Sequence, residues 1–500
     1  MCGKVDYKVY RKQFGEIITT RNSRLFLYVI FFSLILLNVN KIQAQAPGSE
    51  TYKLDTANYD SLYIDKIFII GNKRTKPKII QRELDFKDGD MVLTDGFSER
   101  IKKNEEKLIN TRLFLSAKIS LIEVYGNRVD VIIRLVERWY IFPIPILELA
   151  DRNFKDWWVN QNHSFSRIEW GLKLYIYNMR GRNETLKLSG QLGFTKAFQI
   201  AYSFPSIDKK QKIGLNVAFG YRLNKNIFYN TVYNKRIFLN SNDWLLEGFS
   251  GGISTTYRKS FYSIHTLGAN YYNSHVNDTI VELNSNYYGE GQSQQEYVRL
   301  FYSYVLDKRD ITSYPLKGSY LTVRLDQSGL GFKGNVNKFT VSAIYDRYFN
   351  LGKNFYLSGT VGGRLSTPVR QSYIQYNAMG LGRFTLRGYE LYVIEGPKFI
   401  QNQWTVRKLL FKTQQNLKSI LSARQLRSFH MAIYLKSYFD LGYVEGYPEN
   451  FQNERLTDTW IYGYGAGIDI VTIYDLVLRF EYSFNKEGES GFVFGFRSNF

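Results

Sequence analysis

The chain has 500 residues, a formal net charge of +21 and a single cysteine, Cys2. One cysteine excludes an intramolecular disulfide and any metal site built from several thiolates. The four histidines are far apart in the sequence, and no phosphate-binding or dinucleotide-binding motif is present. The sequence therefore predicts no metal ion and no cofactor.

The first 46 residues have the features of a secretory signal peptide. Basic residues precede the apolar run LFLYVIFFSLILL, Leu25–Leu37, and the small residues of IQAQA, Ile42–Ala46, follow it. A run of 13 apolar residues is short for a membrane-spanning helix, which needs about 20. We therefore expect residues 1–46 to be removed during export. Nucleic acid is a poor partner for an exported protein, so we attribute the positive charge to loops and to a polar lumen.

Residues 61–137, which follow a polar linker at 47–60, predict a small α+β domain. Thr75 is a suitable N-cap for a helix that has Pro77 in its first turn. Gly126-Asn127 between two apolar runs indicates a β-hairpin. The expected order is strand, helix, helix, strand and strand, at residues 63–72, 75–84, 98–114, 116–125 and 128–137.

From Ser166 onward, apolar and polar residues alternate along strand-length segments. In GFVFGFRSNF, for example, Phe492, Phe494, Phe496 and Phe500 lie on one face. A soluble β-sandwich also alternates, but strands of globular proteins average five or six residues and these segments run to about twice that length. Aromatic residues near the ends of the apolar faces are typical of membrane interfaces. A sheet in a bilayer must close on itself, because lipid offers no partners for backbone amides.

We therefore predict an all-β transmembrane barrel of about 16 antiparallel strands at residues 166–500, joined to the α+β domain by a connector at 138–165. The segments 196–204 and 227–239 are the least regular, so fourteen or eighteen strands remain alternatives. The connection 412–428 is longer than the short turn expected at that point. The expected strands begin near residues 166, 183, 196, 211, 227, 246, 260, 296, 318, 336, 354, 399, 429, 460, 475 and 491.

The stretch GLGRFTLRGYELYVIEG, Gly380–Gly396, interrupts this alternation with a glycine-rich loop between the expected strands eleven and twelve. The loop carries Arg387. A guanidinium that lies in a narrow lumen loses water and needs a carboxylate, which can accept hydrogen bonds from two of its N–H groups. Three carboxylates are expected to point inward from their strands: Asp440, Asp469 and Glu481. The alternative for Arg387 is a solvated loop arginine with no fixed partner.

These features resemble the outer-membrane protein assembly and translocation superfamily of the BamA/TamA type. Arg387, Gly388 and Tyr389 match the Arg-Gly-aromatic tip of the sixth extracellular loop in that family, which folds back into the lumen. DKRDITSYPLKGSYL, YFDLGYVEGY and a final aromatic residue match further family segments in the same order. Residues 61–137 resemble the family's POTRA domain through IIGNKRT, IIQREL, LFLSAKI and VDVIIRLVE.

The resemblance implies that the loop arginine pairs with Asp440 and with a glutamate on the strand after the loop. The position aligned with that glutamate is Gln403, which departs from the family pattern. Asp469 and Glu481 are candidate substitutes. The C-terminal barrel signal of the family corresponds to Phe496 and Phe500.

The resemblance also implies a function that is not enzymatic. The barrel would lie in the lipid of the outer membrane and assist the insertion or translocation of polypeptides. The POTRA domain would lie in the periplasm and bind an extended client by adding it to a sheet edge; accessory periplasmic proteins or lipoproteins are further candidate partners. The alternative is a passive pore or surface receptor built on the same barrel.

A barrel enzyme is the least favoured interpretation. GFSGG, Gly248–Gly252, matches the G-x-S-x-G pattern, but a nucleophile elbow requires a turn between a strand and a helix. Ser250 lies within a strand segment with no helical pattern after it, so we predict no catalytic residue.

Overall fold

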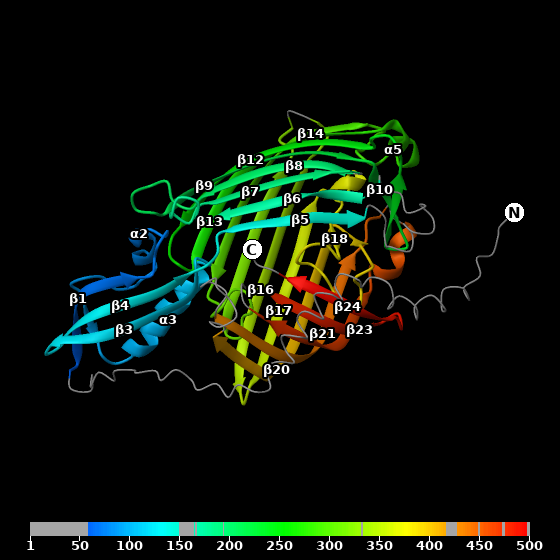
Figure 1. Ribbon diagram of the computed structural model, residues 1–500. Coiled ribbons are helices and arrows are strands. Elements are labelled where there is room, and N and C mark those ends of the chain that lie inside the picture. Colours follow the sequence, from blue (N-terminus) through cyan, green and yellow to red (C-terminus); the bar gives the residue numbers. More distant parts are fainter. Residues whose placement is uncertain are drawn as a thin grey trace.

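The computed structural model describes residues 59–149, 165, 168–193, 195–331, 334–416, 428–448, 451–472 and 476–497. The predicted signal peptide, most of the linker at 47–60 and Phe500 lie outside these residues, as does the side chain of Phe496. A small α+β domain occupies the N-terminal end, and a large curled sheet forms a barrel (Figure 1). The predicted fold class is confirmed.

The N-terminal domain packs two helices on one face of a four-stranded sheet of order β2-β1-β4-β3. β1 runs parallel to β4 and antiparallel to β2. Leu62, Ile64, Leu108 and Ile133 are fully buried at the centre of its core. The elements are β1 (Ser61–Ile70), α2 (Pro77–Gln81), β2 (Met91–Leu93), α3 (Phe97–Asn110), β3 (Phe114–Tyr125) and β4 (Arg128–Glu137).

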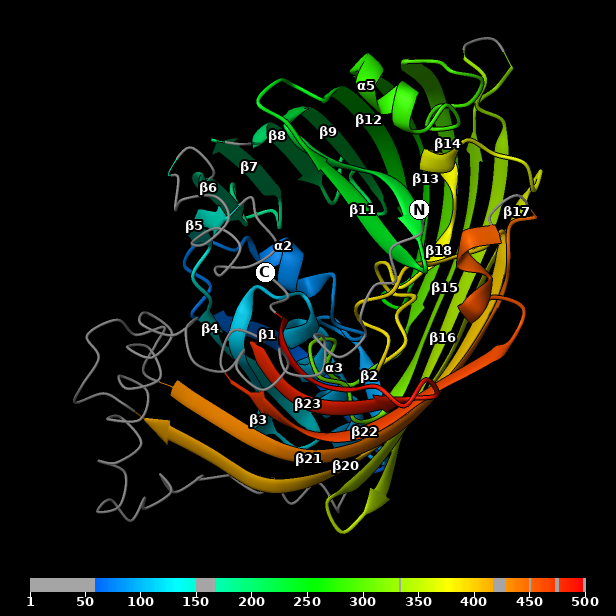
Figure 2. The same ribbon diagram turned by 90° about the vertical axis from the view of Figure 1, so that its right-hand side faces the viewer.

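Sixteen antiparallel strands form a single sheet whose two edges are β5 and β24. Figure 2 shows the sheet curling around a central space. The strands are β5 (Ile141–Leu149), β6 (Ile168–Tyr177), β7 (Thr185–Leu192), β8 (Thr195–Phe204), β9 (Ile213–Asn224), β12 (Leu246–Arg258), β13 (Ser263–Val276), β14 (Gln294–Asp307), β15 (Gly318–Ser328), β16 (Lys338–Gly352), β17 (Phe355–Thr367), β20 (Lys398–Asn416), β21 (Ser428–Glu445), β22 (Trp460–Val471), β23 (Val477–Asn485) and β24 (Ser490–Arg497).

The strand count agrees with the prediction, but two members of the set differ. Residues 141–149, expected in the connector 138–165, form the first wall strand, β5. Its two prolines, Pro143 and Pro145, argue against a strand in the sequence, because proline cannot donate a hydrogen bond within a sheet. Proline occurs in a strand only where its nitrogen faces an unpaired side. The segment expected at 227–239 is a separate hairpin of β10 (Asn226–Val232) and β11 (Lys235–Asn240), outside the wall.

The connection at 412–428 is longer than a turn because its strands continue. β20 and β21 remain paired as far as Asn416 and Ser428. Their outer neighbours stop earlier, since β17 pairs with β20 only to Lys408 and β22 pairs with β21 only from Ala432. The two strands therefore extend past the wall as a hairpin, and residues 417–427 lie outside the described residues.

The wall is apolar outside and polar inside. Large apolar side chains are exposed on the outer face of neighbouring strands, among them Leu172, Ile200, Ile253 and Leu267. Residues of opposite parity carry hydroxyl, amide and charged groups into the lumen. The part of the chain that the structure describes contains no helix long and apolar enough to cross a membrane.

Candidate functional site

The loop Gly380–Gly396 folds back into the barrel. Its base is closed by a short antiparallel pair, β18 (Ala378–Met379) with β19 (Ile394–Glu395), which lies inside the curled sheet (Figure 2). Apolar side chains of the loop pack against the wall in one buried cluster. Its members are Ile344, Met379, Phe384, Leu386, Tyr389, Tyr392, Ile394, Phe399, Val444, Leu456 and Ile461.

The structure brings Arg387 and Asp440 together at the tip of this loop. The guanidinium donates to both carboxylate oxygens, with Nε 2.9 Å from Oδ2, and the backbone N–H of Arg387 donates to Oδ2 at 3.1 Å. Nη1 also donates to Thr405 Oγ1 at 3.0 Å, and the guanidinium lies 4.0 Å from the ring centroid of Tyr438. Asp440 is fully buried, so its charge is neutralised within the lumen.

Gln403 lies beside this ion pair, at the position where the family pattern has a glutamate. Its Nε2 donates to Asp440 Oδ2 at 2.9 Å and to the carbonyl oxygen of Thr385 at 2.8 Å. An amide donor keeps the local balance at one cation and one anion. The departure at Gln403 therefore replaces a second carboxylate with a neutral link between Asp440 and the loop backbone.

Asp469 and Glu481, the candidate substitutes, do not pair with Arg387. Both bond to the buried Lys436, with Lys436 Nζ 2.6 Å from a Glu481 carboxylate oxygen. Tyr314, from the turn between β14 and β15, donates its hydroxyl to Asp469 at 2.9 Å. This prediction was wrong because an inward lysine four residues from Asp440 lies closer to both carboxylates. Lys436 points inward like Asp440, because the two positions are an even number of residues apart on β21, so the sequence could have indicated this lysine as the partner.

Glycines allow the tip to approach the wall closely. Gly388 has φ of +91°, and a Cβ there would lie 2.8 Å from the carbonyl oxygen of Phe484. Gly463 on β22 makes room from the other side, because a Cβ there would lie 1.9 Å from the carbonyl oxygen of Arg387. Asn485 Nδ2 donates to the Gly388 carbonyl at 2.9 Å. The tip is therefore held against β22 and β23, next to the sheet edge β24.

The N-terminal domain is docked on the turns at one end of the barrel, here called the proximal end (Figure 1). Arg258, at the end of β12, donates to both oxygens of Glu83, which is buried, with one distance of 2.8 Å. Asn110 of α3 exchanges two hydrogen bonds with the turn after β14, at Asp310 and Thr312. A third contact joins the turn after β6 to residues 74–76.

At the opposite, distal end, the hairpin β10–β11 reaches the lumen loop and the segment around Asn453. Its turn residues Tyr233 and Asn234 have positive φ, which is typical of a two-residue hairpin turn. The buried Asn234 bonds to Asn453 and, through its carbonyl oxygen, to the N–H of Val393. Thr231 donates to Glu395 at 2.7 Å. The hairpin therefore joins β9 and β12 to the lumen loop and to the 3-10 helix η6 (Phe451–Leu456).

The two edges of the sixteen-stranded sheet, β5 and β24, share no ladder among the described residues. β5 pairs only with β6, and β24 only with β23, among the described residues. Pro143 and Pro145 oppose Leu174 and Leu172, and the carbonyl of Tyr140 accepts from β6. Since partners alternate along a strand, the two prolines face the free edge. The free edge of β5 thus lacks two backbone donors.

The G-x-S-x-G match at Gly248–Gly252 does not form a nucleophile elbow. Ser250 lies within β12, paired on both sides with other strands and not at a turn. No group of three or more His, Cys, Asp and Glu side chains is placed to hold a metal ion in the part of the chain that the structure describes.

A barrel that is apolar outside and polar inside, with an α+β domain at one end and a loop held in its lumen by an arginine, defines an outer-membrane protein of the assembly and translocation class. The chain belongs to the Omp85 superfamily: the Omp85 superfamily domain matches residues 178–500. No curated protein sequence matches the chain.

Solved structures similar to this chain include BamA and CdiB proteins. BamA from Haemophilus ducreyi lacking POTRA domains 1-3 is 14% identical, with a TM-score of 0.49, and the match covers 87% of this chain and 85% of that one. CdiB from Acinetobacter baumannii is 14% identical, with a TM-score of 0.47, over 87% and 73%. CdiB from Escherichia coli is 10% identical, with a TM-score of 0.45, over 91% of each chain.

Proposed function

We propose that this protein assists the insertion or translocation of polypeptides at the outer membrane, and does so without enzymatic chemistry. The distal end would face the cell exterior. The N-terminal domain, as a POTRA domain, would lie in the periplasm and receive an extended client, alone or with accessory periplasmic proteins or lipoproteins.

The observation that carries the proposal is the unpaired seam between β5 and β24. Elsewhere each wall strand is paired on both sides, and in a bilayer an unpaired backbone group is costly. Pro143 and Pro145 remove two donors from the free edge of β5, so full closure with β24 would leave acceptors unsatisfied. Such a seam opens at lower cost than any other line in the wall, and it can admit a client strand or release it into lipid.

The loop tip supports the same role. Arg387 and Asp440 hold it against β22 and β23, next to the seam, and among the described residues β24 pairs with β23 alone. A rigid C-terminal side would keep its edge in place while the β5 side moves.

Depletion of the protein in the bacterium that encodes it tests the proposal. We expect a fall in the levels of several other outer-membrane proteins, measured by quantitative mass spectrometry of isolated outer membranes. The passive-pore alternative predicts unchanged levels together with conductance in planar lipid bilayers. Re-expression of the wild-type chain should restore the levels.

A further inference from the structure

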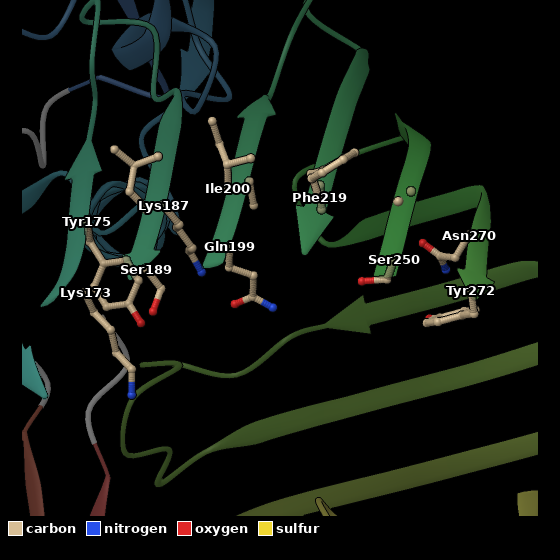
Figure 3. Close-up of a pocket in the computed structure, with 15 residues that line it drawn as sticks. Lys173, Tyr175, Lys187, Ser189, Gln199, Ile200, Phe219, Ser250, Asn270 and Tyr272 are labelled. Carbon is tan, nitrogen blue, oxygen red and sulfur yellow. The ribbon is translucent and has the colours of Figure 1, made fainter. Parts of the chain in front are cut away.

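The inner wall of the N-terminal half of the barrel contains a recess of about 410 Å³, which lies within the size range of ligand sites. It spans β6, β7, β8, β9, β12 and β13. Figure 3 shows Lys173, Ser189 and Gln199 projecting from one side of the sheet and Ile200 from the other. The recess therefore opens on the polar, lumen side of the wall.

Two rows of paired residues build the recess. The first row runs, strand by strand, through Lys173, Ser189, Gln199, Gly220, Ser250 and Tyr272. The second row runs through Tyr175, Lys187, Ala201, Ala218, Gly252 and Asn270. Apart from Gln199, the residues in the middle of both rows are small, so a floor lies between the longer side chains at the two ends.

The floor requires residues this small. A Cβ at Gly252 would lie 2.1 Å from Asn270 Oδ1, and a Cβ at Gly220 would lie 3.1 Å from Ser250 Oγ. Larger residues at these positions would displace the amide and hydroxyl groups that line the floor. Those groups, on Ser189, Ser250 and Asn270, can donate to and accept from a peptide backbone.

The charge of the recess is positive at the end nearest the seam. Lys173 and Lys187 lie diagonally across β6 and β7, and none of the lining residues is acidic. The part of the chain that the structure describes gives neither lysine an ion-pair partner, in contrast to Arg387 and Lys436 deeper in the same lumen. Two uncompensated ammonium groups in a confined space attract anions.

The shape favours a chain over a small anion. Six neighbouring strands at a spacing of about 4.8 Å give a row about 24 Å long, the length of about seven extended residues. A small anion would use only the lysine end and leave the hydroxyl and amide groups unused. β6 is one strand away from the edge β5, so a chain that crosses the seam would meet the lysines first.

We propose that this recess binds an extended polypeptide segment that carries aspartate or glutamate, with the carboxylates at Lys173 and Lys187 and the backbone along the row of hydroxyl and amide groups. The proposal rests on the proposed function, because it assigns a class of client segment to the lumen wall. Under this proposal, the barrel prefers client segments that are extended and acidic.

Fluorescence anisotropy with the full-length chain in detergent micelles tests the recess. The probe is a labelled nine-residue peptide of Ser, Asn and Gly with two adjacent aspartates near one end, and the comparison peptide has Asn in place of both aspartates. We expect the aspartate peptide to bind about tenfold more tightly, since loss of two exposed charge contacts of about 0.7 kcal/mol each amounts to that factor. Binding should weaken as salt rises.

Two double variants separate the recess from charge in general. Lys173→Gln/Lys187→Gln should abolish the preference for the aspartate peptide, while Lys209→Gln/Lys210→Gln, which removes the same charge from the turn between β8 and β9, should retain it. Heat-modifiability on gels shows that each variant is folded. Equal binding of the two peptides by the wild type would overturn the proposal, as would an unchanged preference in the first variant.

Inorganic phosphate distinguishes a chain-binding site from a small-anion site. We expect the aspartate peptide to bind more tightly than inorganic phosphate, because its backbone also contacts the hydroxyl and amide groups. If phosphate binds as tightly as the peptide and displaces it, the proposal for a polypeptide is overturned. The outcome is independent of the depletion experiment. If depletion leaves the levels of outer-membrane proteins unchanged while the wild type still prefers the aspartate peptide, the proposed function is wrong but the recess still binds acidic peptide.

Discussion

Arg387 is the residue whose environment departs furthest from that of an ordinary loop arginine. Its guanidinium is enclosed by Asp440, Thr405 and the ring of Tyr438, and its carboxylate partner has no contact with solvent. The energetic consequence of such a pair is asymmetric. The intact pair contributes modestly, whereas removal of one partner leaves a buried charge without compensation.

Arg387→Ala should therefore destabilise the barrel by about 3–5 kcal/mol, because Asp440 remains buried without its cationic partner. Urea unfolding followed by heat-modifiability on gels measures the change. The matched control is Lys398→Ala, which removes the cation of an exposed pair with Glu445 at 2.9 Å and should cost less than about 1 kcal/mol. Equal losses in the two variants would contradict the role assigned to the loop tip.

The neighbouring carboxylates show how much of the site the sequence determines. Inward parity alone identified Asp440, Asp469 and Glu481 as lumen groups, and the Arg387–Asp440 pair follows from that parity together with the family resemblance. Which cation meets which anion depends on the register of β21, β22 and β23. In that register Tyr434 faces Asp469 and Gly467 faces Glu481, which leaves space for Lys436 between the two acids.

At the scale of elements, the seam depends on strand β5 and its prolines. The alternation of apolar and polar residues identified the other wall strands, because lipid on one side and water on the other impose a period of two. The sequence IFPIPILEL did not predict β5 as a strand, since two prolines argue against any strand that is paired on both sides. The hairpin β10–β11 was predicted to be a wall strand because its residues also alternate, but it lies at the distal end and is not part of the wall.

Restoring the missing donors should strengthen the seam. In Pro143→Thr/Pro145→Thr, two N–H groups become available on the free edge of β5 and can pair with acceptors of β24. We expect slower amide hydrogen exchange in β24 and weaker complementation of the depletion phenotype. Pro205→Thr, in the turn after β8, controls for the general effect of losing a proline on the unfolded chain. Unchanged exchange in β24 would show that the prolines do not keep the seam open.

The docking of the N-terminal domain has a predicted dependence on pH. Burial raises the pKa of Glu106 on α3, and the carboxylate of Asp310 raises it further; burial also raises the pKa of Asp310. A carboxyl with a raised pKa in the docked state opposes docking when it is ionised. This penalty is fully present above the raised pKa and decreases as pH falls through it toward the ordinary value.

Docking should therefore tighten as pH is lowered from 7 through the raised pKa values toward the ordinary values of 4.5 for Glu106 and 3.8 for Asp310. Limited proteolysis within residues 98–110 reports the undocked population, and we expect slower cleavage at the lower pH. Asp310→Asn should make cleavage slower at pH 7 and flatten its pH dependence, because the repulsion of Glu106 is removed. A protease of known pH profile, checked on a reference peptide, gives the correction for enzyme activity. Faster cleavage at pH 5 than at pH 7 would contradict the assignment.

At the scale of the whole molecule, a separate element lies at each end of the barrel, and the wall has one line without a ladder among the described residues. The N-terminal domain is held at the proximal end by Glu83 and Arg258, and the hairpin β10–β11 is held at the distal end by Asn234 and Asn453. Under the proposed function, a polypeptide that enters the lumen would leave it through the seam between β5 and β24. This arrangement supports the proposal of lateral release over free passage from end to end.

Removal of the hairpin should convert the barrel into an open pore. Replacement of residues 226–240 by a short Gly-Ser link removes Thr231 and Asn234, whose hydrogen bonds reach Glu395 and Asn453 across the distal end. The wall should remain intact, because β9 and β12 pair directly with each other along their whole length. We expect a clear rise in single-channel conductance in planar lipid bilayers, with heat-modifiability unchanged. Asn234→Ala alone, which leaves the hairpin in place, should give brief openings instead of a stable open level. If the deletion variant conducts no better than the wild type, the hairpin is not what closes the distal end, and the route through the seam loses its main structural support.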